Sequence, residues 1–290
     1  MASSAALTTR AALSSQMLSE SPSAFGAKST PLQLASPIFG RKLAAPKAPA
    51  QQLKARSSVV TAAVEWKNVP GKLRTISIGD GGALIGTTVT NDIYHWTNNN
   101  WAVQSTGKLK QISTGAKGHW GVSPSDDVWH WDGTTWKNVA GKLKHVASGK
   151  EVWGVSADDQ IWKRNNKPVT DTGLWDVVPG RLAQIDTNDF GDVWGVNATK
   201  QVFRRVDNEF VYVPGPGGQD IIKHVTTGVM GVWAVDTNDV IYRWVLSDSK
   251  DGAWHRDPKE GRLRNIDSGY DSVWGTSHED SIWKYTITHP

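Results

Sequence analysis

Two sets of polar side chains recur at fixed places along the 290-residue chain, and their chemistry suits ligand binding. The first set is the basic residue of a G-(K/R)-L motif, found at Lys72, Lys108, Lys142, Arg181 and Arg262. The second set is a mostly acidic turn position, found at Asn91, Asp126, Asp159, Lys200, Asp239 and Asp280. Cations donate hydrogen bonds and carboxylates accept them, so together they suit a ligand rich in hydroxyl groups, each of which needs both partners. In a competing interpretation the cations and carboxylates pair with each other, or the acidic residue stabilises its own turn.

A third recurring position alternates between aromatic residues and arginine. It is occupied in chain order by Trp96, Trp131, Arg164, Arg205, Trp244 and Tyr285. Because arginine is tolerated there, we expect the position to be partly exposed, and the face of Trp96 or Trp131 could stack on the apolar face of a sugar ring. The alternative is that the rings and guanidinium stems cover the edge of a structural unit.

All three positions belong to one unit that is repeated six times between Trp66 and Tyr285. Each copy carries a V-W-G sequence or a variant of it, whose central residue is Ile85, Trp120, Trp153, Trp194, Trp233 or Trp274. Repeats of about 35 to 45 residues are typical of solenoids and propellers, in which a single unit cannot bury its own apolar face. We therefore expect these tryptophans to fill the space between stacked units, and the glycine after each to let a neighbouring group approach closely.

Within a unit, short runs rich in Val, Ile, Trp and Thr alternate with Gly, Asn, Asp and Pro. In the third copy the predicted strands are residues 143–148, 151–156, 160–164 and 175–178. Four strands in each of six units predict an all-β fold, a six-bladed β-propeller of four-stranded antiparallel blades. This topology places the basic motif and the acidic turn on one face of the ring.

The order of the strands predicts how the ring closes. The segment Trp66–Val69 matches the last strand of the other units, whereas the chain leaves on Ile282–Tyr285. Residues 66–69 should therefore form the outer strand of the sixth blade, whose other three strands lie within residues 263–286. Closing the ring in this way protects the edge that an incomplete blade would expose.

Residues 1–62 differ in composition from the rest of the chain. They contain seven basic residues, one acidic residue and no tryptophan, whereas all 16 tryptophans lie beyond them. Such a segment is predicted to be disordered, and its Ser-rich, basic character is typical of an organellar transit peptide. The Met-Ala-Ser-Ser start and the Val60–Ala63 sequence favour a plastid (chloroplast) transit peptide cleaved near Ala62. A mitochondrial presequence and a plain flexible tail are the alternatives.

The net charge of the chain without residues 1–62 differs from the net positive charge of the whole chain. The remaining chain has 25 basic and 27 acidic residues, so a role in nucleic-acid binding loses its main support. The absence of cysteine excludes disulfides, thiolate catalysis and Cys-ligated metals. No run of about 18 apolar residues predicts a membrane span.

The sequence predicts neither an enzyme nor a cofactor or metal site, because it contains no nucleophile motif, P-loop or dinucleotide fingerprint. His145 and His224 recur at an equivalent position of the first strand, where we expect them to line the central channel as polar side chains rather than metal ligands. Four acidic or amide residues resemble a calcium loop but lack its spacing: Asp186, Asn188, Asp189 and Asp192.

The repeat resembles the tectonin repeat, most clearly in Trp175–Leu182 and Asp192–Asn197. The likeness covers residues 66–285 and implies a six-bladed propeller that binds carbohydrate at loops around the ring. The tectonin family includes slime-mould and fungal tectonins, a horseshoe-crab lectin that binds lipopolysaccharide, and fish-egg lectins.

Two units depart from the family pattern. The first has Ile85 in place of tryptophan, and the fifth has Ala234 in place of glycine and a Pro/Gly insertion at 214–219. These departures predict poor sugar sites in the corresponding blades.

The resulting prediction is a non-enzymatic, lectin-like propeller over residues 63–290. It would bind repeated glycans, lipopolysaccharide or glycolipid surfaces multivalently, with a role in defence implied by the family likeness. The predicted ligand-binding residues are Lys108, Lys142, Arg181, Arg262, Asp126, Asp159, Asp280, Trp96 and Trp131. The alternative is a non-catalytic protein-interaction scaffold that uses the same face.

Overall fold

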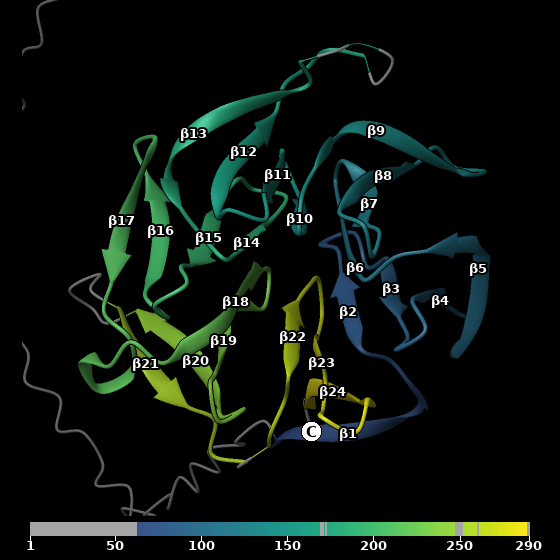
Figure 1. Ribbon diagram of the computed structural model, residues 1–290. Helices are drawn as coiled ribbons and strands as arrows, with labels where there is room; N and C mark the ends of the chain where they lie inside the picture. Colours follow the sequence, from purple (N-terminus) through teal and green to yellow (C-terminus); the bar gives the residue numbers. More distant parts are fainter. Residues whose placement is uncertain (1–62, 169–170, 172, 247–251, 260, 289–290) are drawn as a thin grey trace, which may run out of the picture. The chain divides into compact units, whose positions relative to one another are not determined.

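The fold is a ring of β-sheets. The computed structural model describes residues 63–168, 171, 173–246, 252–259 and 261–288. In this part of the chain, 24 strands form six four-stranded antiparallel sheets, which Figure 1 shows as blades around a central axis. The helical structure in the described residues is limited to one 3-10 turn, Pro216–Gly218, and none of it is long and apolar enough to cross a membrane. The predicted six-bladed, all-β propeller is confirmed, whereas the predicted transit peptide lies outside the described residues.

Five blades take their strands in chain order from the axis outwards. The first blade consists of β2 (Thr75–Ile78), β3 (Leu84–Thr87), β4 (Asp92–Thr97) and β5 (Asn100–Lys108). The second consists of β6 (Gln111–Gly115), β7 (Gly118–Val122), β8 (Asp127–Trp131) and β9 (Trp136–Lys142). The third consists of β10 (His145–Ser148), β11 (Val152–Val155), β12 (Gln160–Arg164) and β13 (Trp175–Arg181). The fourth consists of β14 (Gln184–Thr187), β15 (Val193–Val196), β16 (Val202–Val206) and β17 (Glu209–Val213). The fifth consists of β18 (Ile222–Gly228), β19 (Gly231–Asp236), β20 (Ile241–Leu246) and β21 (Gly252–Arg256).

The sixth blade joins the two ends of the folded region. It contains β22 (Asn265–Ser268), β23 (Val273–Thr276) and β24 (Ser281–Thr288), and its outer strand is β1 (Ala63–Lys72). The β1–β24 register runs from Ala63 opposite Thr288 to Val69 opposite Ile282, followed by a bulge. The predicted closure by residues 66–69 is confirmed, and the observed strand extends beyond both predicted ends.

The apolar core is divided among the interfaces between blades. Between the third and fourth blades, for example, Trp153 packs in one buried cluster with Leu182 and Ile185. Five of the V-W-G tryptophans are between 1% and 6% exposed, and Ile85 takes the same buried place in the first blade. The predicted structural role of this ring of residues is confirmed, because each one closes the gap to the next blade.

The glycine after each buried tryptophan allows a leucine to approach closely. A Cβ atom built on this glycine would lie 2.3 to 2.5 Å from a methyl carbon of the leucine in the G-(K/R)-L motif of the same blade. The pairs are Gly86 with Leu73, Gly121 with Leu109, Gly154 with Leu143, Gly195 with Leu182 and Gly275 with Leu263. In the fifth blade Ala234 replaces the glycine and Ile222 replaces the leucine, and both lie in one buried cluster. The β-branched isoleucine, an isomer of leucine with one methyl group on Cβ, accompanies the added methyl group of Ala234.

Candidate functional site

The basic motif and the acidic turn lie on the same face of the ring, which we call the rim. The rim consists of the turns between the second and third strands of each blade and the adjacent ends of the outer strands. Asp127, at the start of β8, is opposite Lys142, at the end of β9. In the third blade Gln160 is opposite Arg181 in the same way. The antiparallel register therefore brings the two sequence motifs together.

The six rim turns share one backbone geometry. The acidic turn residue adopts a left-handed conformation with φ of 61° to 71°, at Asn91, Asp126, Asp159, Lys200, Asp239 and Asp280. Its N–H donates to the carbonyl three residues earlier, as from Asp159 to Ser156 at 3.0 Å. Asp and Asn tolerate this conformation better than most other residues, which accounts for much of the recurrence at this position.

The carboxylates of Asp126, Asp159 and Asp280 are held by cations of their own blades. Their ion-pair partners are Lys110, Lys144 and Arg264, and the three aspartate side chains are between 21% and 30% exposed. The backbone carbonyl of each also accepts a hydrogen bond from a leucine N–H of the next blade, at 2.9 to 3.0 Å. These residues therefore stabilise turns and join blades, as in the competing interpretation of the sequence. Their role in ligand binding stays a prediction.

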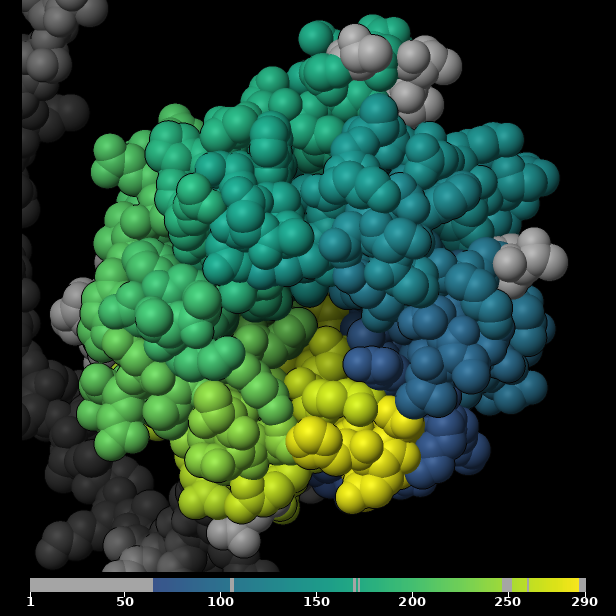
Figure 2. All heavy atoms as spheres, viewed as in Figure 1, coloured from purple at the N-terminus to yellow at the C-terminus, as the bar shows by residue number. Residues whose placement is uncertain are grey.

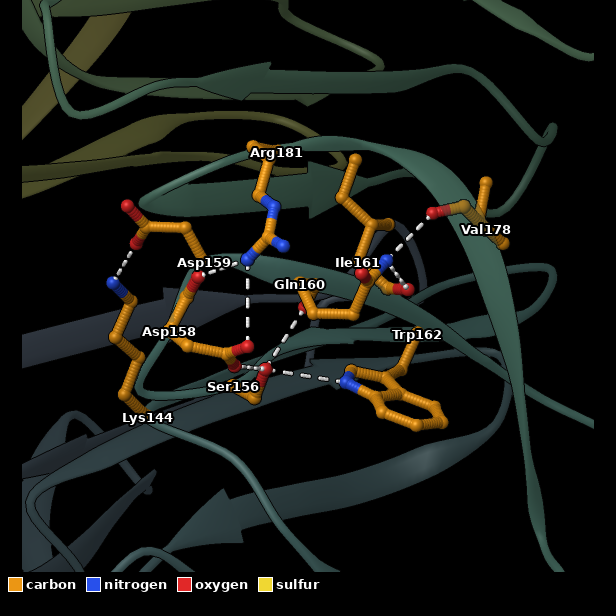
Figure 3. Close-up of polar contacts among 9 residues, drawn as sticks. All are labelled: Lys144, Ser156, Asp158, Asp159, Gln160, Ile161, Trp162, Val178 and Arg181. Carbon is orange, nitrogen blue, oxygen red and sulfur yellow. Dashed lines mark hydrogen bonds and ion pairs between the residues drawn. The ribbon is translucent and has the colours of Figure 1, made fainter.

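The basic residues of the rim are more exposed. The side chains of Lys108, Lys142 and Arg181 are 55% to 64% exposed, and each reaches an acceptor in the turn of its own blade. Their carboxylate partners are Asp92, Asp127 and Asp158, next to the left-handed residue rather than at it. Figure 3 shows this arrangement in the third blade, where Arg181 reaches Asp158 while Lys144 pairs with Asp159.

The carboxylates beside the rim cations stay ionised at neutral pH. Hydrogen bonds from Lys108 and Lys142 lower the pKa of Asp92 and Asp127, respectively, and the Ser156 hydroxyl lowers the pKa of Asp158. A lysine ammonium group has three donors, an arginine guanidinium group has five, and a carboxylate has about four acceptor sites, so each pair keeps capacity for ligand hydroxyls. Reasoning from the sequence missed these three carboxylates, although their position opposite the basic motif in the predicted hairpin was a usable signal.

A hollow of about 450 Å³ opens on the rim between the fifth and sixth blades, and we call it the rim pocket. Its charged lining includes Lys259, Arg262 and Glu279, and Trp66 and Trp283 contribute aromatic surface. The pocket therefore combines donors, an acceptor and aromatic rings in one place. The substitutions in the fifth blade predict a poor site there, yet the residues that follow its last strand form one wall of this pocket.

The polar groups of the rim pocket are fixed by hydrogen bonds. Ser277 Oγ donates to Glu279 Oε2 at 2.9 Å, and this bond lowers the pKa of Glu279, so the carboxylate is ionised at neutral pH. Lys72 Nζ donates to the backbone carbonyl of Glu279 at 2.8 Å. Trp66 Nε1 donates to Asp257 Oδ2 at 2.5 Å, which fixes the orientation of the indole. Of the pocket residues, reasoning from the sequence identified Arg262 alone.

Trp96 and Trp131 lie away from the rim. Each lies in the third strand of its blade, at or next to the end that is farther from the rim turn. Both rings line a separate pocket of about 360 Å³ between the first and second blades. Trp96 packs on the buried Trp274 of the preceding blade, with ring centroids 5.8 Å apart, and the equivalent Arg205 lies 4.7 Å above Trp153. This position therefore covers the V-W-G residue of the preceding blade, as the alternative interpretation proposed. The structure does not bring these tryptophans together with the rim cations.

Figure 2 shows a narrow opening at the centre of the ring. The channel is lined by polar side chains of the six inner strands. The residues predicted to line it do so: Thr75, Gln111, His145, Gln184, His224 and Asn265. The amide of Gln111 pairs with both backbone groups of Val146 in the next blade, at 2.9 and 3.0 Å. These amides therefore link neighbouring inner strands.

The two histidines of the channel lie near each other, with ring centroids 6.3 Å apart. Burial lowers the pKa of His145 to about 3 and that of His224 to about 4, so both are neutral at pH 7. No group of three or more potential metal ligands occurs among the described residues. In the calcium-like segment, Asn188 Oδ1 accepts three backbone N–H groups of its own turn instead.

Two buried carboxyl groups share one hydroxyl in the channel. Thr226 Oγ1 lies 2.8 Å from Asp186 Oδ2 and 2.6 Å from Asp267 Oδ1. A hydroxyl has a single proton, so both hydrogen bonds can form only if one of the carboxyl groups is protonated and donates. Burial raises the pKa of Asp267 to about 6, and burial together with the nearby Asp267 raises the pKa of Asp186.

Replacing Asp186 with asparagine should raise the free energy of unfolding at pH 7.5 by about 1–3 kcal/mol. The amide keeps an acceptor for Thr226 but cannot ionise. Because folding raises the pKa of the carboxyl pair, the pair's contribution to stability is present below about pH 4 and is lost as pH rises through about 6. Urea unfolding at several pH values should therefore show an advantage of Asp186→Asn that is small at pH 4 and grows towards pH 7.5.

The pH dependence of stability of the variant must be compared with that of the unsubstituted protein. The channel histidines change the stability with pH in the opposite direction to the carboxyl pair. Folding lowers the pKa of His145 and His224, so their contribution is present above about pH 6.5 and is lost as pH falls. Asp207→Asn, at an exposed turn, removes the same charge as a control. An advantage of Asp186→Asn that is equal at every pH would contradict the proposed shared proton.

The fold and the rim define a β-propeller with a repeated polar face. The chain belongs to the tectonin family, because the family model of the tectonin domain matches residues 53–210 and 181–289. It is similar to the fish-egg lectin of Cyprinus carpio, with 28% identity over 191 residues. That match covers 60% of this chain and 66% of the lectin, slightly less than two thirds of its length.

Solved structures with the same general fold have little sequence in common with this chain. The RRP9 WD40 repeats match with a TM-score of 0.55 and 9% identity, over 77% of this chain and 97% of that one. Prp20p from Saccharomyces cerevisiae matches with a TM-score of 0.52 and 8% identity, over 72% and 70%. At these identities the likeness concerns the propeller fold alone.

Proposed function

We propose that this protein is a non-catalytic, lectin-like β-propeller that binds carbohydrate at its rim. The rim pocket carries the proposal, because Arg262, Glu279 and Trp283 supply a donor, an acceptor and an aromatic ring in one hollow. Sugar hydroxyls need donors and acceptors, and the apolar face of a sugar ring packs on aromatic rings. The tectonin domain and the similarity to a fish-egg lectin support this function.

The proposed ligands are repeated glycans on a surface, such as bacterial or fungal glycans, lipopolysaccharide or glycolipids. A single shallow sugar site binds at about millimolar strength, near −4 kcal/mol. The exposed cation–carboxylate pairs of the other blades could engage further residues of the same glycan coat, and avidity would then raise the overall affinity. We place this activity in defence and in the plastid, with the mitochondrion as the alternative compartment.

Replacing Arg262 with alanine should weaken binding to a glycan by about tenfold, or about 1.4 kcal/mol, because the rim pocket loses a charged donor. The full-length protein is first applied to a glycan array, and the variants are then titrated with the glycan that binds best. The double variant Lys142→Ala/Arg181→Ala tests the repeated rim pairs in the same way. Lys137→Ala removes a lysine of similar exposure (57%) from another part of β9 and should leave binding unchanged.

Several results would contradict the proposal. If neither the Arg262 variant nor the double variant alters glycan binding while melting curves show folded protein, the rim is not the binding face. If no glycan on the array binds at all, the carbohydrate function itself is wrong.

A protein-interaction scaffold is the second candidate. The sequence predicts that such a scaffold uses the rim, whereas the observation that favours it concerns the opposite face. The loops between the first and second strands of the fourth, fifth and sixth blades carry Phe190, Val229 and Tyr270, which are 68%, 46% and 60% exposed. Exposed apolar side chains that form a continuous patch are typical of surfaces that bind a partner. A stable protein partner that is lost on Phe190→Ser/Tyr270→Ser, together with an empty glycan array, would favour the scaffold.

A further inference from the structure

A second hollow, of about 430 Å³, lies between the second and third blades on the face opposite the rim, and we call it the basic pocket. Its basic lining residues are Lys117, His130, Lys150, Arg164 and Lys167. They come from two neighbouring blades: the β6–β7 turn and β8 on one side, and the β10–β11 turn, β12 and the loop after β12 on the other. The buried Trp120 contributes apolar surface to the lining.

The lysines of the basic pocket are not neutralised by carboxylates. Among the residues that the structure describes, the ammonium groups of Lys117, Lys150 and Lys167 have no ion-pair or hydrogen-bond partner. Glu151 also lines the pocket, but its carboxylate pairs with Lys163 at 2.6 Å. This contrasts with the rim, where the exposed cations reach acceptors in their own blades.

Two other carboxylates near the basic pocket form no ion pair with its lining residues. Asp132 acts electrostatically on His130 but pairs with Lys137, at 3.5 Å. Asp171 acts on Arg164 at longer range, without forming an ion pair. The surrounding acidic residues therefore leave most of the positive charge available.

The guanidinium group of Arg164 is fixed in the wall of the pocket by backbone carbonyls. Its Nη1 donates to Asn165 at 2.5 Å and to Leu174 at 3.2 Å, and its Nη2 donates to Lys167 at 2.6 Å. Its Nε is buried and has no hydrogen-bond partner in the described structure. The wall of the pocket thus contains a positioned charge, and the lysines without partners lie around it.

The positive lining is not a general property of this place in the fold. The corresponding pocket between the first and second blades is lined by His95, Gln104, His119 and the two tryptophans described above, without lysine or arginine. The interface of the second and third blades therefore carries a positive charge that the neighbouring interface of the first and second blades lacks.

We propose that the basic pocket binds a compact oxyanion, a phosphate or sulfate monoester. A phosphate monoester carries about −1.5 to −2 charge at pH 7 and three strong acceptor oxygens. Lysine ammonium groups and a guanidinium group are the donors that bind such an oxyanion. This site is independent of the proposed carbohydrate function, because it lies on the other face and shares no residue with the rim.

The full-length protein should bind glycerol 3-phosphate saturably in isothermal titration calorimetry, and glycerol should not compete. The double variant Lys117→Ala/Lys150→Ala should weaken this binding at least tenfold. Both side chains are exposed and unpaired, so the variant should melt at the temperature of the unsubstituted protein. Lys67→Ala removes a lysine of β1, in the sixth blade, whose side chain is 59% exposed, and it should leave the affinity unchanged. Inorganic sulfate should compete if the pocket recognises oxyanions as a class.

A second arm distinguishes a soluble ester from a lipid headgroup. Flotation with phosphatidylcholine vesicles that contain phosphatidic acid presents the same monoester on a bilayer. Binding of either probe that depends on Lys117 and Lys150 supports the site, and the probe that is preferred identifies the source. The proposal is overturned if neither probe binds, or if Lys67→Ala weakens binding as much as the double variant does.

Discussion

Deleting residues 63–72 should lower the melting temperature of the protein by about 10–20 °C or prevent folding altogether. These residues form β1, which supplies every backbone hydrogen bond to the outer edge of β24. Trp66 packs on Trp233 and Tyr285, with ring centroids 6.3 and 5.2 Å away, and its loss leaves the buried Asp257 without its indole donor. Losing a large packed ring and a buried hydrogen bond costs more than about 5 kcal/mol, and each kcal/mol lowers the melting temperature by about 2–4 °C at this size.

Thermal unfolding followed by circular dichroism measures this effect. Removal of residues 1–57 is the control, because this shortened protein keeps β1 and its melting temperature should be unchanged. If the shorter chain does not fold, a peptide of residues 63–72 added in excess should restore part of the folded signal. An unchanged melting temperature after removal of β1 would mean that the pairing of β1 with β24 does not hold the ring together.

The second large effect is expected from replacing Gly154 with alanine, which should destabilise the protein by about 1–3 kcal/mol. The added Cβ would lie 2.4 Å from Leu143 Cδ1 and 3.2 Å from the carbonyl oxygen of His145, so the side chain or the strand must shift. Adding Leu143→Ile should recover about 1 kcal/mol, because the fifth blade combines Ile222 with Ala234 at the same two positions.

A double-mutant cycle from urea unfolding tests this compensation. Gly81→Ala is the matched control, since no atom lies within 4 Å of the added Cβ and the stability should hardly change. If the two changes at 143 and 154 add without coupling, the pairing in the fifth blade is coincidental and the cost of Gly154→Ala has another origin.

The fold could be predicted from the sequence because the repeat supplies its own internal comparison. Trp153 and Gly154 recur with the same neighbours in most copies, so burial between blades and close packing followed directly from their residue types. The closing strand was also predictable, because Trp66 matches the start of an outer strand and has no partner elsewhere in the repeat. These features depend on local pattern and on the order of strands.

The site depends on contacts that the repeat pattern does not contain. Asp159 and Arg181 could be placed on one face, but their choice of partners, Lys144 and Asp158, follows from side-chain reach across a turn. The left-handed backbone of Asp159 favours Asp or Asn for conformational reasons, so an acidic residue at this position is not by itself evidence of binding. Recurrence in a repeat therefore reports structural need first, and the departures from it are more informative about binding.

The rim pocket could not be predicted from the sequence, because residues that are far apart in the chain form it. Trp66 belongs to the first strand of the folded region, whereas Arg262 and Trp283 lie near its end. The pairing of β1 with β24 brings them together, and the fifth blade, which forms one wall, was expected from its motifs to have a poor sugar site. The same applies to the basic pocket, where side chains of two blades meet without a shared motif.

The pairing of Ala63 with Thr288 also determines the order in which the molecule can be completed. The β1–β24 ladder joins the two most distant parts of the folded chain, and such non-local contacts form late because the intervening loop must first be closed. A chain released from the ribosome before Ser281 is synthesised would hold β1 without its neighbour and β23 with an open edge. Unpaired strand edges invite pairing with other chains. Until its final strand emerges, the nascent protein is therefore at its most prone to aggregation, and early binding of a chaperone to β1 would protect it.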